Sequence, residues 1–187
     1  MEANHPPSPP LEEATFGGGC FWCLETVLNQ IRGVIQAESG YSNGHHPHPT
    51  YDDICTGNTG HAEVVRVRFD PAVVSYPQLL EVFFTIHDPT TLNRQGNDVG
   101  TQYRSGVYTH SDAQAQQARA LIDELNARHV FSMPIVTEVR PVANYHPAEN
   151  YHQGYFEHNP HAGYCSFVVA PKVSKFRQAF ADLLKKG

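Results

Sequence analysis

The sequence has no surplus of positive charge and no long hydrophobic run. Its 187 residues include 13 Lys and Arg against 19 Asp and Glu, which gives a formal net charge of −6 at pH 7. A basic surface for nucleic acid or anionic lipid is therefore not expected. No apolar run approaches the ~20 residues of a membrane-spanning helix, and residues 1–5 show no secretory signal. We expect a cytoplasmic protein without nucleic-acid or membrane partners.

Cysteine is also scarce. Four are present, at Cys20, Cys23, Cys55 and Cys165. Without an export signal they are not expected to form structural disulfides, because cytosolic thiols are kept reduced. A zinc site would need a second pair beside the Cys-x-x-C at 20–23, and the other two cysteines are far apart in the sequence. We interpret the histidines at 45–48 as part of a surface loop, so no metal is expected.

The composition changes once along the chain. Residues 1–13 contain four prolines and almost no apolar side chain, which predicts a disordered tail. From 14 to 187 the composition is even, without an internal repeat or a linker, which predicts a single catalytic domain. Hydrophobic residues make up 40% of the chain, and this length is sufficient for one core.

Hydrophobic spacing predicts a mixture of strands and helices. Strands are expected at 14–16, 34–41, 63–69, 106–109, 135–142 and 167–170, and helices at 21–31, 75–84, 112–129, 148–157 and 171–184. Long polar loops at 43–50 and 88–104 interrupt the alternation. These interruptions favour a two-layer α+β sandwich, with helices packed on a mixed or antiparallel sheet, over a doubly wound sheet.

A glycine run precedes the first cysteine. Gly17, Gly18 and Gly19 follow a predicted strand and allow the backbone to turn tightly. Cys20 then lies in the first turn of a predicted helix, where free N–H groups and the helix dipole stabilise an anion. We therefore expect a lowered thiol pKa and an accessible nucleophile. The alternative is a small buried cysteine at a tight turn.

The residues after Cys20 allow two interpretations. Cys23 completes a Cys-x-x-C on one helix face, a spacing that suits dithiol exchange. Phe21 and Trp22, the only tryptophan, point in different directions on a helix. They form either an apolar wall around a small substrate group or part of the core.

Two polar loop segments, 50–63 and 95–105, each offer a tyrosine hydroxyl and a carboxyl group. The tyrosines are Tyr51 and Tyr103. Glu63 stands at the start of an apolar strand, where partial burial would raise the pKa of its carboxyl and suit it to general acid catalysis. The alternative is a solvated glutamate at a strand end.

Four motifs together resemble the A-type peptide methionine sulfoxide reductases over residues 14–178. They are Gly-Cys-Phe-Trp at 19–22, Thr-Gly-His-Ala-Glu at 59–63, Gly-Asn-Asp-Val-Gly-Thr-Gln-Tyr-Arg-Ser at 96–105 and Tyr-His-Gln at 151–153. The resemblance implies a two-layer α+β sandwich with a ferredoxin-like core. It also implies reduction of the S epimer of methionine sulfoxide, free or in proteins, and hence repair of oxidised proteins.

The resemblance also implies roles for individual residues. Cys20 would be the nucleophile that becomes a sulfenic acid. Glu63 would donate a proton to the sulfoxide oxygen, aided by the hydroxyls of Tyr51 and Tyr103. The substrate pocket would be formed by Phe21, Trp22 and Asp98. This agrees with the chemistry, because a sulfoxide needs its oxygen protonated as its sulfur is attacked.

One position departs from the family pattern. Residue 23 is usually glycine in the family and is cysteine here. Gly-Tyr-Cys at 163–165 matches the position of a resolving cysteine, so Cys165 is the favoured resolving residue and Cys23 its rival. The family is reduced by thioredoxin or a small dithiol and needs no bound cofactor. We expect a monomer, and we interpret Cys55 as structural. The alternative function is a general dithiol–disulfide oxidoreductase that uses Cys20 and Cys23.

Overall fold

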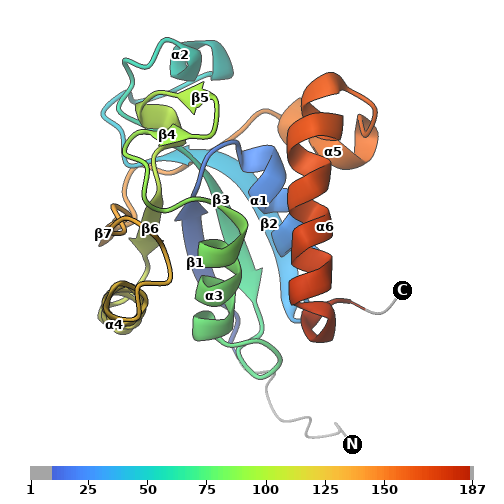
Figure 1. The fold of residues 1–187 in the computed structure, drawn as a ribbon. Helices are drawn as coiled ribbons and strands as arrows, with labels where there is room; N and C mark the ends of the chain where they lie inside the picture. Colours follow the sequence, from blue (N-terminus) through green and yellow to red (C-terminus); the bar gives the residue numbers. More distant parts are fainter. Residues whose placement is uncertain (1–9, 186–187) are drawn as a thin grey trace, which may run out of the picture.

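The structure is a computed structural model that describes residues 10–185. Its centre is a six-stranded sheet with the order β7-β6-β1-β3-β2-β8 (Figure 1). Neighbouring strands are antiparallel except for β6 and β7, which are parallel. A mixed sheet with helices packed on it is the α+β class that the sequence predicts.

The elements follow one another along the whole described chain. The strands of the sheet are β1 (Glu12–Gly17), β2 (Val34–Ser42), β3 (Ala62–Phe69), β6 (Gly106–Thr109), β7 (Glu138–Pro141) and β8 (His146–Pro147). A separate hairpin is formed by β4 (Arg94–Gln95) and β5 (Asp98–Val99). The α-helices are α1 (Phe21–Leu28), α2 (Tyr51–Cys55), α3 (Tyr76–Ile86), α4 (Asp112–Ala127), α5 (Tyr155–His158) and α6 (Ala170–Ala179). Short 3-10 turns lie at Thr101–Tyr103, Asn150–His152 and Ala181–Leu183.

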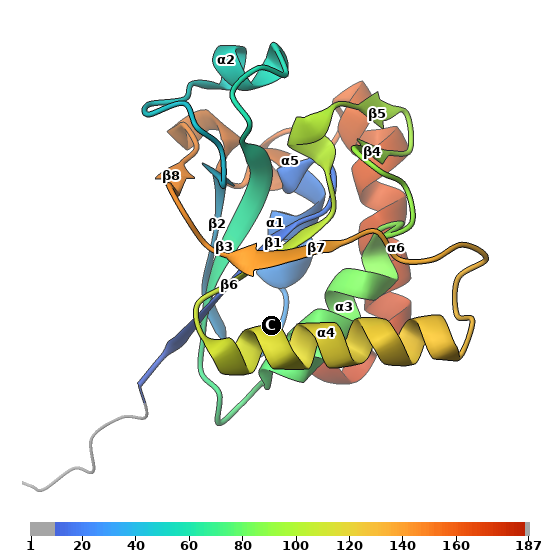
Figure 2. The same cartoon turned by 90° about the vertical axis from the view of Figure 1, so that its left-hand side faces the viewer.

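The core lies between the sheet and the helices. On β3, Val65, Val67 and Phe69 alternate toward the main core, as their spacing predicts, while Val64 belongs to a small cluster with Tyr108. Helix α1 packs on β2 and β3 and lies between the sheet and α6 (Figure 1). Helix α4 runs below β6 and β7 (Figure 2). Within the described residues, no helix has the length and hydropathy needed to cross a membrane.

The predicted strand at 167–170 is wrong. This segment is helical: a π-helical turn, Cys165–Val169, leads directly into α6. Pro171 has no N–H to donate, and a wider turn before it accommodates the missing hydrogen bond. The buried side chains of this helix recur every three or four residues, at Cys165, Val169, Val173 and Phe176. That spacing is helical and was present in the sequence.

Other boundaries differ by a few residues. Helix α1 ends at Leu28, because the Asn29 side chain accepts a hydrogen bond from the Ala37 N–H (3.1 Å) and starts the turn into β2. The helix predicted at 148–157 is divided by Gly154, whose φ is +67°. Strand β1 already begins at Glu12, inside the predicted tail, and residues 1–9 of that tail lie outside the described residues.

Helix α3 begins with reciprocal side-chain caps. The Ser75 hydroxyl accepts from the Gln78 N–H (3.2 Å), and the Gln78 side chain accepts from the Ser75 N–H (2.9 Å). We expect Ser75→Ala to lower the free energy of unfolding by about 1 kcal/mol, since it removes the cap. Urea denaturation measures this difference, with Ser132→Ala at an exposed position outside the helices as the control. An unchanged midpoint for Ser75→Ala would contradict the prediction.

Candidate active site

The glycine turn brings Cys20 against two other segments. Cys20 is the residue before α1 and is 8% exposed. Gly19 has a φ of +87°, and a Cβ there would lie 2.7 Å from the Gln95 side chain. A Cβ on Gly18 would lie 3.1 Å from the His87 ring. Glycine suits position 19 because of its backbone conformation. It suits both positions because the Gln95 and His87 side chains approach them closely.

The hairpin that carries Asp98 is held against this turn. The Gln95 side chain accepts from the Asp88 N–H and donates to the Asp88 carbonyl, both at 2.9 Å. Gln95 and Asp98 face each other across β4 and β5. Figure 1 shows this hairpin, α2 and the start of α1 at the same end of the sheet. Residues from three distant parts of the sequence therefore meet there.

Tyr103 is positioned by the arginine that follows it. Arg104 donates from Nε to the Glu138 carboxylate of β7 (2.7 Å) and from its guanidinium to the Thr101 carbonyl (2.9 Å). The Tyr108 hydroxyl donates to the same Glu138 oxygen (2.7 Å). This network fixes the 3-10 turn that ends at Tyr103 relative to the sheet.

Glu63 is a buried acid. It is 2% exposed, and its Oε1 accepts from the Phe21 N–H at the start of α1 (3.3 Å). Burial raises the pKa of Glu63 to about 8; Asp98 adds to the increase and the Phe21 N–H opposes it. The carboxyl is therefore mostly protonated at pH 7 and available as a proton donor. The predicted increase of this pKa is confirmed, and the alternative of a solvated glutamate is wrong.

The predicted lowering of the Cys20 pKa is wrong. Burial raises the pKa of this thiol well above its usual range, and Glu63 and Cys23 raise it further. The Trp22 N–H in the first helical turn and the Tyr164 hydroxyl lower it, but only in part. The amide of Phe21, which could also face the thiol, is directed to Glu63 instead. In this structure the nucleophile candidate is a neutral thiol beside a neutral acid.

Two tyrosine hydroxyls complete the polar side of the site. Tyr51 and Tyr103 are half-buried, and burial together with Glu63 raises the pKa of both, so they stay protonated donors. Tyr51 begins α2, where its N–H donates to Glu149 (3.1 Å) and its ring lies 4.3 Å from the His152 ring. Asp98 and Cys20 also raise the pKa of Tyr103, so the Tyr103 hydroxyl belongs to the same cluster of polar groups as Glu63.

The apolar side is formed around Trp22. Its Nε1–H donates to His152 Nδ1 (3.1 Å), and its indole stacks on the Tyr155 ring with centroids 3.9 Å apart and planes 11° apart. Phe21 is fully buried, with its ring 5.7 Å from Tyr41 and 5.1 Å from His152. Trp22 is therefore partly exposed at this side of the site, and Phe21 lies in the core, with both rings near His152.

The segment that carries His152 and Tyr155 is anchored by buried polar contacts. Glu25 of α1, 3% exposed, accepts from the Gly154 N–H with both oxygens (2.8 and 3.0 Å). The Gln153 side chain accepts from the Ser39 N–H and donates to the Ser39 carbonyl, both at 2.9 Å. Sequence reasoning assigned no role to these residues, although Tyr-His-Gln at 151–153 marked the segment.

Tyr164 also belongs to the site, although the sequence analysis assigned it no role. Its hydroxyl donates to Asp98 Oδ2 at 2.6 Å, and its ring meets the edge of Trp22 with centroids 5.7 Å apart. The same hydroxyl lies close enough to the Cys20 thiol to lower its pKa. The only signal in the sequence was its place directly before Cys165.

The four cysteines are free thiols with different surroundings. Cys23 is 2% exposed, and burial raises its pKa to about 11; Lys172 lowers it, while Asp98 and Cys165 raise it. Cys165 is fully buried. Cys55 is exposed at the end of α2, where its thiol raises the pKa of the Tyr51 hydroxyl. It therefore lies at the edge of the site rather than in the core.

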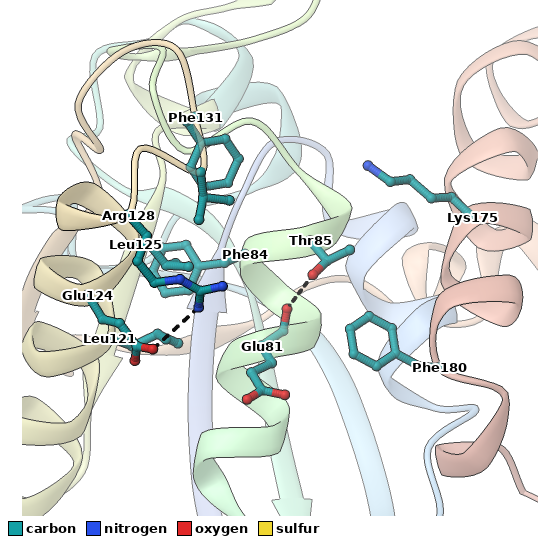
Figure 3. A pocket seen from close by; sticks show the side chains of 11 residues that line it. Glu81, Phe84, Thr85, Leu121, Glu124, Leu125, Arg128, Phe131, Lys175 and Phe180 are labelled. Atoms are coloured by element: carbon teal, nitrogen blue, oxygen red, sulfur yellow. Dashed lines mark hydrogen bonds and ion pairs between the residues drawn. The ribbon is translucent and has the colours of Figure 1, made fainter.

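Residues 10–185 also contain cavities away from this site, and they lack a metal-binding cluster. Within residues 10–185, no group of three or more His, Cys, Asp or Glu side chains is arranged to hold a metal ion. A cavity of about 410 Å³ lies between α3, α4 and α6 (Figure 3). Its walls are mainly apolar, with Phe84, Leu121 and Phe180 beside the ion pair of Glu124 and Arg128 (3.4 Å). None of the candidate site residues lines it.

Comparison with known proteins assigns the family. The sequence model described as Peptide methionine sulfoxide reductase matches residues 12–184. The chain belongs to the peptide methionine sulfoxide reductase family. It is 56% identical to the peptide methionine sulfoxide reductase MsrA of Polynucleobacter asymbioticus, over 94% of this chain and 93% of that protein. It is therefore an oxidoreductase that reduces methionine sulfoxide, as the motifs predicted, and the general dithiol oxidoreductase is not favoured.

Solved structures support the same assignment of fold. Methionine sulfoxide reductase A of Corynebacterium diphtheriae is similar with a TM-score of 0.78 and 37% identity, over 83% of this chain and 78% of that chain. Reduced Mxr1 from Saccharomyces cerevisiae has a TM-score of 0.76 and 36% identity, over 83% and 90% of the two chains. Mxr1 in complex with Trx2 has a TM-score of 0.54 and 26% identity, over 83% and 91%.

The raised pKa of Glu63 predicts a pH dependence for this reductase. An acid catalyst must be protonated, and the protonated fraction of Glu63 falls as the pH rises through about 8. We expect the rate of the first turnover to fall above that pH. In Glu63→Gln we expect a rate ~100-fold lower, without the descending limb. Rapid-quench measurement of methionine from pH 6 to 10 tests this, and an unchanged profile in Glu63→Gln would remove Glu63 from the mechanism.

Proposed function

We propose that this reductase acts on the S epimer of methionine sulfoxide, free or in proteins, with Cys20 as nucleophile and Glu63 as acid. The observation that carries the proposal is the convergence of a buried thiol and a buried carboxyl whose pKa is about 8. The arrangement suits a poor electrophile whose oxygen must be protonated during attack. Repair of oxidised proteins follows from this reaction.

In the first step, Glu63 donates a proton to the sulfoxide oxygen, to which Tyr51 and Tyr103 donate hydrogen bonds, and the Cys20 sulfur bonds to the sulfoxide sulfur. The thiol proton of Cys20 passes to the Glu63 carboxylate. The hydroxyl group then moves from the substrate sulfur to the Cys20 sulfur as the bond between the two sulfurs breaks, so that methionine leaves and Cys20 becomes a sulfenic acid. One thiol and one sulfoxide thus give one thioether and one sulfenic acid.

The substrate is held on the apolar side of the site. We assign Trp22, with Phe21 behind it, as the apolar wall against which the methyl group on sulfur packs. His152 and Tyr155 hold the Trp22 ring in place. Asp98 organises the polar contacts opposite it. Burial of one methyl group contributes about 0.8 kcal/mol to the free energy of binding. The contacts of Tyr51, Tyr103 and Glu63 with the sulfoxide oxygen therefore supply the rest of the selectivity for methionine sulfoxide.

In the second step, a second thiol attacks the Cys20 sulfur, water leaves, and a disulfide forms. We favour Cys165 as this residue. It is fully buried and acts on the pKa of Cys23, so it lies in the same group of thiols. Cys23 is the second candidate, because it lies in the same helical turn as Cys20 and raises the Cys20 pKa directly.

The disulfide is then reduced by an external dithiol. Mxr1, a similar protein, has been solved in complex with Trx2. We propose thioredoxin, or a small dithiol, as the reductant of this chain, with no bound cofactor. We also propose that the protein acts as a monomeric single domain in the cytoplasm, where a reducing environment keeps its four thiols free.

Incubation of fully reduced protein with each epimer, without reductant, tests the reaction. We expect methionine from the S epimer alone, and none from either epimer with Cys20→Ser, since the substitution removes the proposed nucleophile. Cys55→Ser, at the exposed edge of the site, is the matched cysteine control. No methionine from wild type with either epimer would favour the dithiol oxidoreductase, and activity in Cys20→Ser would refute the assigned nucleophile.

Two further cysteine variants identify the resolving residue. We expect Cys165→Ser to form methionine normally in the first turnover but to lose thioredoxin-supported cycling, since its sulfenic acid has no partner. Cys23→Ser should keep cycling. Methionine per enzyme with and without thioredoxin is the measurement. The opposite pattern, with cycling lost only in Cys23→Ser, would make Cys23 the resolving residue.

A further inference from the structure

Tyr164 is a partly exposed side chain that joins several groups of the site. Its hydroxyl donates to Asp98 (2.6 Å) and acts on the Cys20 pKa, while its ring meets the edge of Trp22. With this contact in place, Cys20 is 8% exposed and Glu63 is 2% exposed. The reacting groups are thus enclosed, although a substrate must reach them.

A groove lies on the other side of this contact. It has a volume of about 330 Å³, within the range of ligand sites. Asp98 and Tyr164 line it, together with the 95–97 turn, Phe167, Val168, Pro171 and Lys172, whereas Cys20 and Glu63 do not. The hydrogen-bonded pair of Tyr164 and Asp98 therefore borders both the groove and the reacting thiol. Phe167, which is 84% exposed, offers the groove an apolar side.

We propose that the Tyr164–Asp98 hydrogen bond is a gate that closes the active site until substrate binds. The proposal rests on the function proposed above. When a polypeptide lies in the groove, its methionine sulfoxide side chain displaces the Tyr164 hydroxyl and reaches Cys20. The apolar side of the groove and the amine of Lys172 suit a peptide with apolar and acidic residues beside the oxidised methionine.

The gate also controls the resolving thiol. Tyr164 and Cys165 are consecutive, and the chain is helical from residue 163 into α6. Displacement of Tyr164 by substrate therefore moves Cys165 as well. After methionine leaves, Tyr164 returns to Asp98 and brings Cys165 back to its resting position near Cys23, from which it reacts with the Cys20 sulfenic acid. The second step is thus delayed until the first product has left, and Tyr164 is a positioning residue for it.

Alkylation of the resting enzyme tests the closed gate. We expect Tyr164→Phe to react with iodoacetamide at Cys20 about tenfold faster than wild type, a factor that corresponds to ~1.4 kcal/mol. Site-resolved mass spectrometry of the reduced full-length protein measures the rate. Loss of a hydroxyl that lowers the Cys20 pKa would by itself slow the reaction. A slower or unchanged rate would therefore overturn the gate.

Two further variants keep this test decisive. Tyr145→Phe removes a tyrosine–carboxylate hydrogen bond of the same length, 2.6 Å to Glu38, away from the site, and should leave the alkylation rate unchanged. Asp98→Ala breaks the gate from its other side and should raise the rate as Tyr164→Phe does. If Asp98→Ala does not raise it, the pair is not the closing contact.

The lifetime of the sulfenic acid tests the coupling between the Tyr164 gate and the resolving thiol of Cys165. After one turnover with the S epimer, we expect dimedone to trap several times more sulfenic acid per methionine formed on Tyr164→Phe than on wild type. A structural defect would lower methionine formation without raising this ratio. Equal trapping in the two proteins would overturn the coupling. Failure of wild type to form methionine would instead overturn the proposed function, so the two failures are distinguishable.

Discussion

The burial of the Glu63 carboxyl beside the Cys20 thiol is the constraint on which the rest of the site depends. A charged carboxylate would be costly there, so the acid keeps its proton at neutral pH, and the same burial keeps the thiol neutral. The Phe21 N–H at Glu63, and the Trp22 N–H and the Tyr164 hydroxyl at Cys20, interact with these groups without adding charge. In the reaction that we propose, substrate triggers both proton transfers, and this requirement favours molecules that offer an acceptor oxygen and an electrophilic sulfur.

A second requirement is that residues far apart in the sequence keep this site dry. The 150–158 segment packs on α1 through the bonds of Glu25 and Gln153, and it supplies the His152 and Tyr155 rings that hold Trp22. In the gate that we propose, the helix that contains Cys165 closes the remaining side through Tyr164. In this proposal the closing helix also carries the second thiol, so that protection of the intermediate and its resolution depend on the same part of the chain.

Local patterns predicted much of the fold. Alternation on β3 and the apolar spacing of α1 and α3 correctly predicted which faces are buried, because burial follows periodicity in regular elements. The prediction of a strand at 167–170 is wrong. Proline is typical of the first turn of a helix, so Pro171 indicated a helix start, but a π-helical turn before it continues directly into α6. The contacts of Tyr164 and Glu25 could not be predicted from local patterns, since the partner of each lies more than 60 residues away in the sequence.

The sequence by itself determined the family, because four motifs occur in recognisable order. These motifs contain Cys20, Glu63 and Tyr103, three of the residues to which we assign the reaction. The sequence also determined the tight turn before Cys20, since only glycine permits that approach. Only the tertiary structure decided the protonation states. A helix N-terminus alone would lower the pKa of Cys20, but the energy of a charge depends on the solvent that the whole fold removes, and here that loss outweighs the local N–H groups.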